Sequence, residues 1–342
     1  MSHPLSKRLI GTKTAATQAS GPPAPHWPSY RGMSRFVGTS PSGKVAVYVD
    51  PSLGAPGLQN ANDLLADADR IVGVNDSIFG TIGGPVRVIV FAFDGATDGT
   101  GGADHLGCDF ATGADIEVCA AFGDSTRVSA LFEAELSECS MGGNLCGTST
   151  GEALSRWCAA VVSNNALADF ASAPAWFQKG RPDFVNHTDP TDRKSVSTGC
   201  GMAFLSWLMS KGFRLDRIAQ TMVGLGDTGT LAQLYAQLTS EPAAKALPLF
   251  RAAVQSLPHG IVDDDPFGGA AHAQHLAGQE SSAAELAERI LAVVLADIAA
   301  GRTAEQLAAD VRAIIDAIGG GHSMATCSNR SRRLRPPSAE AA

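Results

Sequence analysis

The sequence predicts an α/β fold of the α+β kind, in which a twisted N-terminal sheet with an edge hairpin precedes a mostly helical C-terminal half. Three observations support this prediction. Apolar residues alternate at period two in residues 44–50, residues 85–93 form a second β-rich run, and apolar residues recur at helical spacing in residues 60–74 between them. Helical periodicity dominates from residue 127 onward. The chain has 342 residues and is 44% hydrophobic, which is enough to bury a core in one large domain or two ordinary ones.

The N-terminal half is expected to contain an arm, a strand–helix–strand unit and a hairpin. Residues 1–30 are rich in Ser, Thr, Gly, Pro and Ala, and their GPPAPHWP run suits neither a helix nor a strand ladder, which indicates a flexible arm. Residues 94–107 contain five glycines and are expected to form a loop. In residues 108–119, the sequence Ala111-Thr-Gly-Ala is expected to be a turn between two short strands.

Helices are expected in the rest of the main domain, which spans residues 31–257. Their predicted ranges are 127–141, 151–163, 195–211, 214–222 and 229–238. Residues 258–281 are interpreted as a linker. Capping boxes at Ser282 with Glu285 and at Thr303 with Gln306 then begin two helices, which form a helical hairpin over 282–320. Residues 321–342 are expected to be a disordered basic tail.

Charge and hydropathy exclude several classes of protein. Lys and Arg number 26 against 34 Asp and Glu, and the net charge of −8 repels nucleic acid and anionic lipid. The longest apolar runs, such as residues 86–93, are far shorter than the ~20 residues of a membrane span. The first 30 residues lack the continuous apolar segment of a secretory signal. We therefore expect a cytoplasmic protein whose partners include neither nucleic acid nor a membrane.

The helix predicted at 127–141 carries the first candidate for a functional site. Glu135 falls inside its apolar face, Glu138 lies at the edge of that face, and Glu133 is expected to point away into solvent. An ionised carboxylate on a buried face needs a partner, because leaving it unpaired costs several kcal/mol or raises its pKa. Glu135 is either part of a site or a structural carboxylate bonded to serine, backbone or arginine. The apolar face is formed by Val128, Leu131, Phe132, Leu136 and Cys139.

A second carboxylate, Glu152, opens the following helix. It comes 14 residues after Glu138, and the glycine-containing turn GGNLCGTST lies between the two helices. This turn allows the second helix to cross the first, so that Glu135, Glu138 and Glu152 can converge in one pocket. The alternative for Glu152 is a surface ion pair with Arg156, one helical turn later in the favourable orientation.

The order of these residues resembles a zinc metallopeptidase of the gluzincin kind. In such enzymes a helix carries His-Glu-x-x-His, whose histidines bind zinc and whose glutamate acts as general base, and a glutamate on the next helix supplies the third ligand. Residues 134–138 (AELSE) occupy the motif, and Gly151-Glu152-Ala153 occupies the third-ligand position. Over roughly residues 40–240 the chain is similar to the plant basic secretory protein family of peptidase-like proteins. The resemblance implies a zincin-like fold, with Glu135 as general base and Glu152 as a metal ligand.

The chain departs from that family at both zinc histidines. Ala134 stands at the first position and has no donor atom, and Glu138 stands at the second. Zinc prefers nitrogen and sulfur donors, so zinc is not expected, whereas a divalent cation such as Ca²⁺ or Mg²⁺ could use Glu138 and Glu152 together with waters or carbonyls. His105 lies in the loop before the hairpin and could reach the pocket as a metal ligand; a hydrogen-bonding role is the alternative.

Other polar residues have weaker functional alternatives. His187 lies in a polar turn expected to cap the helix from residue 195. Cys200, flanked by glycines, could open a helix whose dipole lowers its pKa, but no histidine is near in sequence. Four aspartates in the glycine-rich loop could bind a divalent cation, but they lack the EF-hand spacing, and aspartate with glycine is also common in turns. They are Asp94, Asp98, Asp104 and Asp109. The sequence leaves open whether bridges join Cys108 to Cys119 or Cys139 to Cys146.

Three hypotheses of function follow. The first is a degenerate metallopeptidase-like protein without zinc peptidase activity, which binds a protein or peptide partner or has a structural role. The second is a metal-dependent hydrolase with a carboxylate-rich site and Glu135 as general base. The third is a self-assembling structural subunit, a homo-oligomer formed through the helices of residues 282–320.

Overall fold

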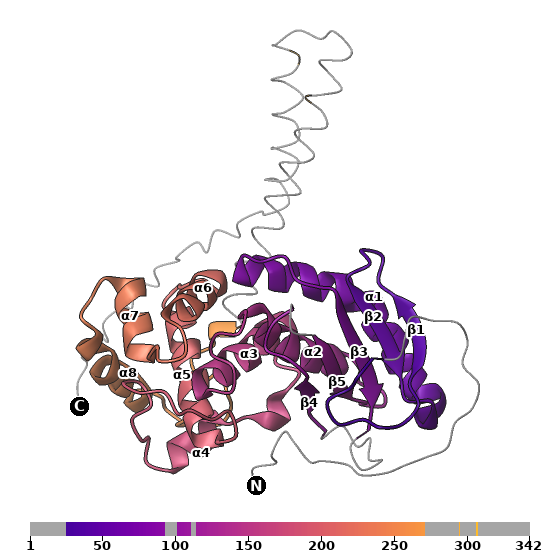
Figure 1. Cartoon of the computed structure of the whole chain (residues 1–342). Helices are drawn as coiled ribbons and strands as arrows, with labels where there is room; N and C mark the ends of the chain where they lie inside the picture. The colour runs from indigo at the N-terminus through magenta and orange to yellow at the C-terminus, as the bar shows by residue number, and fades with distance from the viewer. Residues whose placement is uncertain (1–24, 93–100, 111–113, 271–293, 295–305, 307–342) are drawn as a thin grey trace, which may run out of the picture. The chain divides into compact units, whose positions relative to one another are not determined.

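The computed structural model describes residues 25–92, 101–110, 114–270, 294 and 306. The chain divides into two units, Met1–Leu276 and Ala277–Ala342. The first unit combines one sheet with a series of helices (Figure 1). This arrangement confirms the predicted α/β class. Several predicted features lie wholly or largely outside the described residues: the arm up to residue 24, the turn at 111–113, the linker from 271, the helical hairpin at 282–320 and the tail at 321–342.

The sheet has five described strands in the order β1-β2-β3-β5-β4. Strands β2, β3 and β5 run parallel, and β1 and β4 pair antiparallel at the two edges. The parallel strands consist largely of Val and Ile and are buried along almost their whole length, as expected for a parallel sheet covered on both faces. The strands are β1 (Arg35–Thr39), β2 (Val45–Val49), β3 (Val86–Phe91), β4 (Ala103–His105) and β5 (Asp115–Cys119).

One face of the sheet is covered by α1 (Gly54–Phe79) and α2 (Ser125–Ser140). Their apolar side chains form one core with the strands, in which Leu64 and Phe132 are completely buried. Helix α1 is longer than the predicted 60–74 because it begins directly after the short 3-10 turn Pro51–Leu53 and ends only at Gly80, whose φ of +66° suits glycine.

The remaining helices form a second core, and α3 (Ser149–Val162) connects this core to α2. The helices predicted at 127–141, 151–163, 195–211, 214–222 and 229–238 are all present, with ends shifted by at most three residues. The helices α4 and α8 and the edge strand β1 were not predicted. The helices of this part are α3 (Ser149–Val162), α4 (Ala173–Gln178), α5 (Ser195–Ser210), α6 (Leu215–Leu225), α7 (Leu231–Thr239) and α8 (Ala246–Gln255).

The predicted flexible arm at 1–30 extends too far, because its last residues are packed on the sheet. Trp27 is only 4% exposed, and its ring meets that of Tyr48 edge-on at 5.4 Å. Ser29 and Tyr30 donate backbone hydrogen bonds of 2.8 and 2.5 Å to the carboxylate of Glu117 on β5. These contacts cover the face of the sheet opposite α1 and α2.

The predicted linker at 258–281 is likewise packed over the part that is described. Asp264 is 5% exposed and accepts hydrogen bonds from the backbone N–H groups of Ser172 and Ala173, at 2.8 and 2.6 Å, at the start of α4. Ile261 and Ala270 are also buried. Two of the aspartates that suggested a linker instead accept backbone hydrogen bonds, Asp264 at the start of α4 and Asp265 from Gly269 and Ala270.

The edge hairpin is present, but its first strand lies earlier than predicted. β4 covers residues 103–105, ahead of Cys108, and pairs with β5 so that Asp104 faces Glu117. His105, expected in a loop, is therefore the last residue of an edge strand. Among the described residues, none belongs to a helix both long and apolar enough to cross a membrane.

Candidate functional site

Helix α2 supplies two of the candidate site residues from the centre of the molecule. Asp124 caps it by accepting a hydrogen bond of 3.1 Å from the backbone N–H of Arg127. The helix packs against α1, α3, β4 and β5, so side chains on nearly all of its faces are buried. The predicted apolar face is buried in full, and Glu135 within it is 8% exposed.

The expectation that Glu133 is solvated is wrong. Glu133 is completely buried, because α1 covers the face of α2 that the helical wheel left to solvent. Asn75 of α1 donates a hydrogen bond of 3.3 Å to Glu133 Oε1, and the other carboxyl oxygen, Oε2, has no hydrogen-bond partner. Burial raises the pKa of Glu133 to about 8, although the hydrogen bonds from Asn75 and Ser137 act to lower it.

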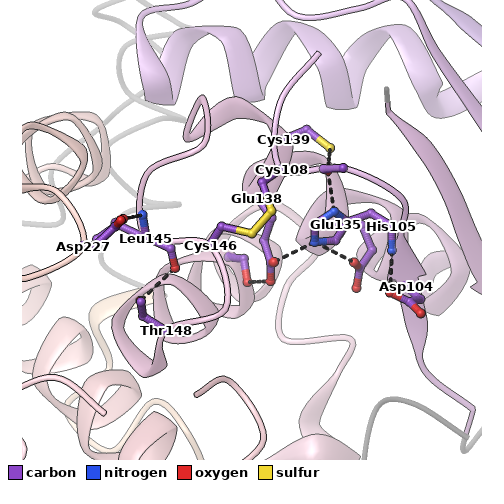
Figure 2. The surroundings of a disulfide bond; sticks show 12 residues. Asp104, His105, Cys108, Glu135, Glu138, Cys139, Leu145, Cys146, Thr148 and Asp227 are labelled. Atoms are coloured by element: carbon purple, nitrogen blue, oxygen red, sulfur yellow. Dashed lines mark hydrogen bonds and ion pairs between the residues drawn. A yellow bond between two sulfur atoms is a disulfide. The ribbon is translucent and has the colours of Figure 1, made fainter. Parts of the chain in front are cut away.

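His105 lies against both glutamates of the predicted site (Figure 2). Its Nε2 is 2.9 Å from Glu138 Oε2 and 4.0 Å from Glu135 Oε2. On the other side of the ring, Nδ1 is 2.6 Å from the carbonyl oxygen of Gly107, so Nδ1 carries a proton and donates it there. The three side chains of His105, Glu135 and Glu138 remain between 11% and 13% exposed, so solvent reaches the cluster.

Glu152 joins this group from the first turn of α3, as the sequence predicted. The turn between α2 and α3 reverses the chain through left-handed residues, of which Leu145 (φ +62°) is not a glycine. Thr148 caps α3, accepting a hydrogen bond of 3.1 Å from the N–H of Gly151. Glu152 is 6% exposed, and its buried Oε1 has no hydrogen-bond partner, since Arg156 Nη1 stands 3.7 Å away. The predicted ion pair with Arg156 is thus present, but it is buried rather than on the surface.

The charges in this cluster act on each other strongly. Burial, followed by the charge of Glu138, raises the pKa of Glu152 to about 8 and that of Glu135 well above its ordinary value. Burial also opposes the ionisation of Glu138, but its hydrogen bond with His105 and the charge of His105 outweigh burial and lower its pKa. Burial would lower the pKa of His105, whereas Glu138 and Glu135 raise it to about 10. At neutral pH the cluster therefore contains an imidazolium paired with the Glu138 carboxylate.

A disulfide bond joins the two arms of the cluster, which are the segment after His105 and the turn before Glu152. Cys108, three residues after His105, is bonded to Cys146, six residues before Glu152, with their Cα atoms 6.0 Å apart. The sequence had left open a Cys108–Cys119 and a Cys139–Cys146 bond, whereas the structure pairs Cys108 with Cys146. The described free cysteines Cys119, Cys139, Cys158 and Cys200 are all buried.

Zinc does not fit these residues. Ala134 offers no donor atom, and the Nε2 of His105, the nitrogen that would bind a metal, is occupied by Glu138. Within the described ranges, no three His, Cys, Asp or Glu side chains are grouped in a way that could hold a metal ion. Zinc prefers nitrogen and sulfur donors, and His105 is the one histidine that the described residues place in this cluster.

Other predicted candidates are distributed differently. Asp104 is on β4. Its pKa is raised mainly by burial and to a smaller extent by the charge of Glu138. The ring of His187 lies 5.1 Å from that of Phe184. Cys200 is buried within α5 rather than at its start, and burial raises its thiol pKa, which is the opposite of nucleophile activation. Asp94 and Asp98 lie outside the described residues.

Ser155 is a site residue that the sequence interpretation missed. Its hydroxyl donates a hydrogen bond of 3.1 Å to Glu138 Oε1. The signal was available, because Ser155 lies three residues after Glu152 and so on the same face of α3.

Comparison with models of protein families gives no match for this chain. Comparison with curated proteins gives no match either.

Proposed function

We propose that this protein is a metallopeptidase-like scaffold that lacks zinc peptidase activity and serves a binding or structural role, with a protein or peptide as its partner. The zincin-like character of the fold belongs to this proposal. It is supported by the order of a mixed sheet with an antiparallel edge strand, a helix bearing Glu135 and a second helix bearing Glu152.

The contact between His105 and Glu138 is the observation that carries this proposal. An imidazolium already supplies the positive charge that neutralises the carboxylate cluster, with Nε2 2.9 Å from Glu138 Oε2. A divalent cation would have to displace this charge, and the imidazole would have to lose a proton before it could bind a metal. The residues thus favour an internal ion pair over metal chemistry.

Metal analysis of the purified full-length chain tests the proposal. We expect less than one zinc per ten chains after dialysis, because the donor set is poor. Stoichiometric zinc would overturn the proposal. A peptidase assay comparing the wild type with Glu135→Gln is the second measurement, and we expect no activity above background in either protein.

The second candidate is a hydrolase that uses a carboxylate-held metal. Its support is that Glu135, Glu138 and Glu152 are near enough to shift one another's pKa values and that carboxylates are ligands for hard cations, although the described residues do not group these side chains as a metal site. Hydrolysis that depends on added Mg²⁺ or Ca²⁺ and is lost in Glu135→Gln would establish this candidate in place of the first.

Assembly through residues 282–320 and a cytoplasmic location also remain proposals. The helices concerned lie outside the described residues. The Cys108–Cys146 bond weighs against the cytoplasm, because glutathione and thioredoxin keep thiols reduced there.

A further inference from the structure

The segment that carries His105 is held to the domain by hydrogen bonds, including one of 2.9 Å from the N–H of Leu106 to the carbonyl oxygen of Asp115 on β5. β4 is three residues long and pairs only with β5 among the described strands. Beyond it, the Gly107 carbonyl accepts hydrogen bonds from His105 Nδ1 at 2.6 Å and from Cys139 Sγ at 3.6 Å. The carbonyl oxygen of Cys108 accepts one more, of 2.8 Å, from the N–H of Gly143. The disulfide bond is the one covalent link in this set.

The opposite arm of the disulfide is the turn between α2 and α3. Gly142, Gly143 and Gly147 all have positive φ, and a side chain at Gly142 or Gly147 would meet open space. Leu145 is the buried residue that anchors the turn, at 1% exposure. The N–H of Leu145 also donates a hydrogen bond of 2.6 Å to Asp227 Oδ1, so we expect the glycines of the turn, rather than Leu145, to gain mobility once the cross-link is removed.

The bonded cysteines differ from the free ones in their exposure. Cys108 and Cys146 are both partly exposed, whereas Cys119, Cys139, Cys158 and Cys200 are buried. We therefore expect a reductant in solution to reach the bonded pair more readily than the four cysteines that form no disulfide bond, because thiol–disulfide exchange requires access to a sulfur atom.

We propose that the Cys108–Cys146 bond is a redox-controlled clasp that holds His105 in contact with Glu138, and that a dithiol reductant opens it. The bond spans the cluster: one arm leads to His105 on β4 and the other to Glu152 on α3. Figure 2 shows the bond between the arms, with Glu138 beside it. Once the bond is open, only non-covalent contacts hold Gly107, and we expect Gly107 and the imidazole that its carbonyl orients to become more mobile.

The chemistry of opening is disulfide exchange. One thiolate of the reductant attacks the sulfur of one cysteine, and the other cysteine leaves as a thiolate that takes up a proton. The second thiol of the reductant then attacks the mixed disulfide. Two electrons reduce the bond to two thiols, and the reductant is released as a disulfide.

Hydrogen exchange on the full-length protein, with and without dithiothreitol, tests the clasp. A linked peptide containing Cys108 and Cys146 must first be found by mass spectrometry in the untreated protein, and its absence would overturn the proposal. On reduction, we expect the Gly143 amide, which donates to Cys108, to exchange at least tenfold faster relative to the Val88 amide in the central strand β3. Equal acceleration at both amides would show that the disulfide bond stabilises the whole fold rather than this segment, and would also overturn the proposal.

A second readout follows the site itself. Modification of His105 by diethyl pyrocarbonate is expected to become at least fivefold faster after reduction, because the ring leaves its contact with Glu138. An unchanged rate after complete reduction would contradict the clasp. In the double variant Cys108→Ser/Cys146→Ser, His105 is expected to react at the fast rate without reductant, and dithiothreitol should add nothing. If this variant does not fold, reduction of the wild type decides alone.

The clasp rests on the proposed function in one respect, because the site that the bond controls is the His105–Glu138 contact of that proposal. Stoichiometric zinc would end the proposed function and leave the exchange measurements unaffected. Equal acceleration of Gly143 and Val88 would end the clasp and leave the proposed function standing.

Discussion

His105 Nε2 lies 2.9 Å from Glu138 Oε2, although the two residues are 33 positions apart in the chain. The pair joins an edge strand to the helix beside it. Because both side chains are nearly buried, each depends on the other for its charged state. This relationship decides how the cluster responds to mutation and to pH.

Replacing His105 by Gln should destabilise the protein by about 3 kcal/mol at pH 7, because the buried Glu138 would lose the cation that stabilises its charged form and would have to stay charged alone or take up a proton. The pKa of His105 is raised from 6.5 to about 10 by the pairing, so its contribution is complete below pH 6.5 and is lost as the pH rises through 10. The difference in unfolding free energy between wild type and variant, measured with urea, should therefore shrink between pH 7 and pH 10. The control is Arg214→Gln at the exposed ion pair with Asp216, where we expect a change within about 0.5 kcal/mol.

Replacing Glu133 by Gln should stabilise the protein increasingly as the pH rises. The pKa of this carboxyl is raised by burial from 4.5 to about 8, so the folded state binds a proton that the unfolded state releases, and the wild type loses stability between these pH values. Gln keeps the volume and cannot ionise. Urea unfolding at pH 5 and pH 9 should show a gain for the variant that is larger at pH 9 by up to about 4 kcal/mol. A difference that does not depend on pH would show that Glu133 has an ordinary pKa.

Replacing Gly199 by Ala should destabilise the packing of α5 against the start of α4. A Cβ atom at Gly199 would lie 2.1 Å from the carbonyl oxygen of Ser172, which is backbone and cannot move aside cheaply. We expect a loss of about 1–3 kcal/mol in thermal or urea unfolding. The matched control is Gly73→Ala in α1, where no atom lies within 4 Å, and a gain of about 0.5–1 kcal/mol is expected from helix propensity. If the two substitutions had the same effect, close packing at Gly199 would be refuted.

Replacing Asp264 by Ala should cost about 1–3 kcal/mol, because the backbone N–H groups of Ser172 and Ala173 lose their acceptor inside the protein. Val262→Ala is the control two residues away, since Val262 is 72% exposed, and it should change stability by less than about 0.5 kcal/mol. Urea unfolding measures both. Equal values for the two variants would mean that this segment is a linker after all.

The helices of the site were predictable because each is specified by its own sequence. The periodicity of α2 placed Glu135 on a buried face, and the glycine-rich turn before α3 allowed Glu152 to return to the same place. Local signals of this kind depend on residues within a few positions of one another.

The errors share a different cause. Glu133 was assigned to solvent because a helical wheel shows which face of a helix is apolar and not which neighbours cover the other faces. Residues 258–270 were assigned to a linker because aspartate and glycine suit both turns and helix caps, and only the position of α4 decides between them.

The sequence by itself determined the α/β class, the order of most elements and the acidic residues of α2 and α3, because hydrophobic periodicity is a local property of the chain. Only the tertiary structure decided that His105 neutralises Glu138, that Cys108 bonds to Cys146 and that Glu133 is buried. Each of these depends on contacts between segments distant in sequence, whose positions follow from how the sheet and helices pack together. Local sequence does not encode those distances.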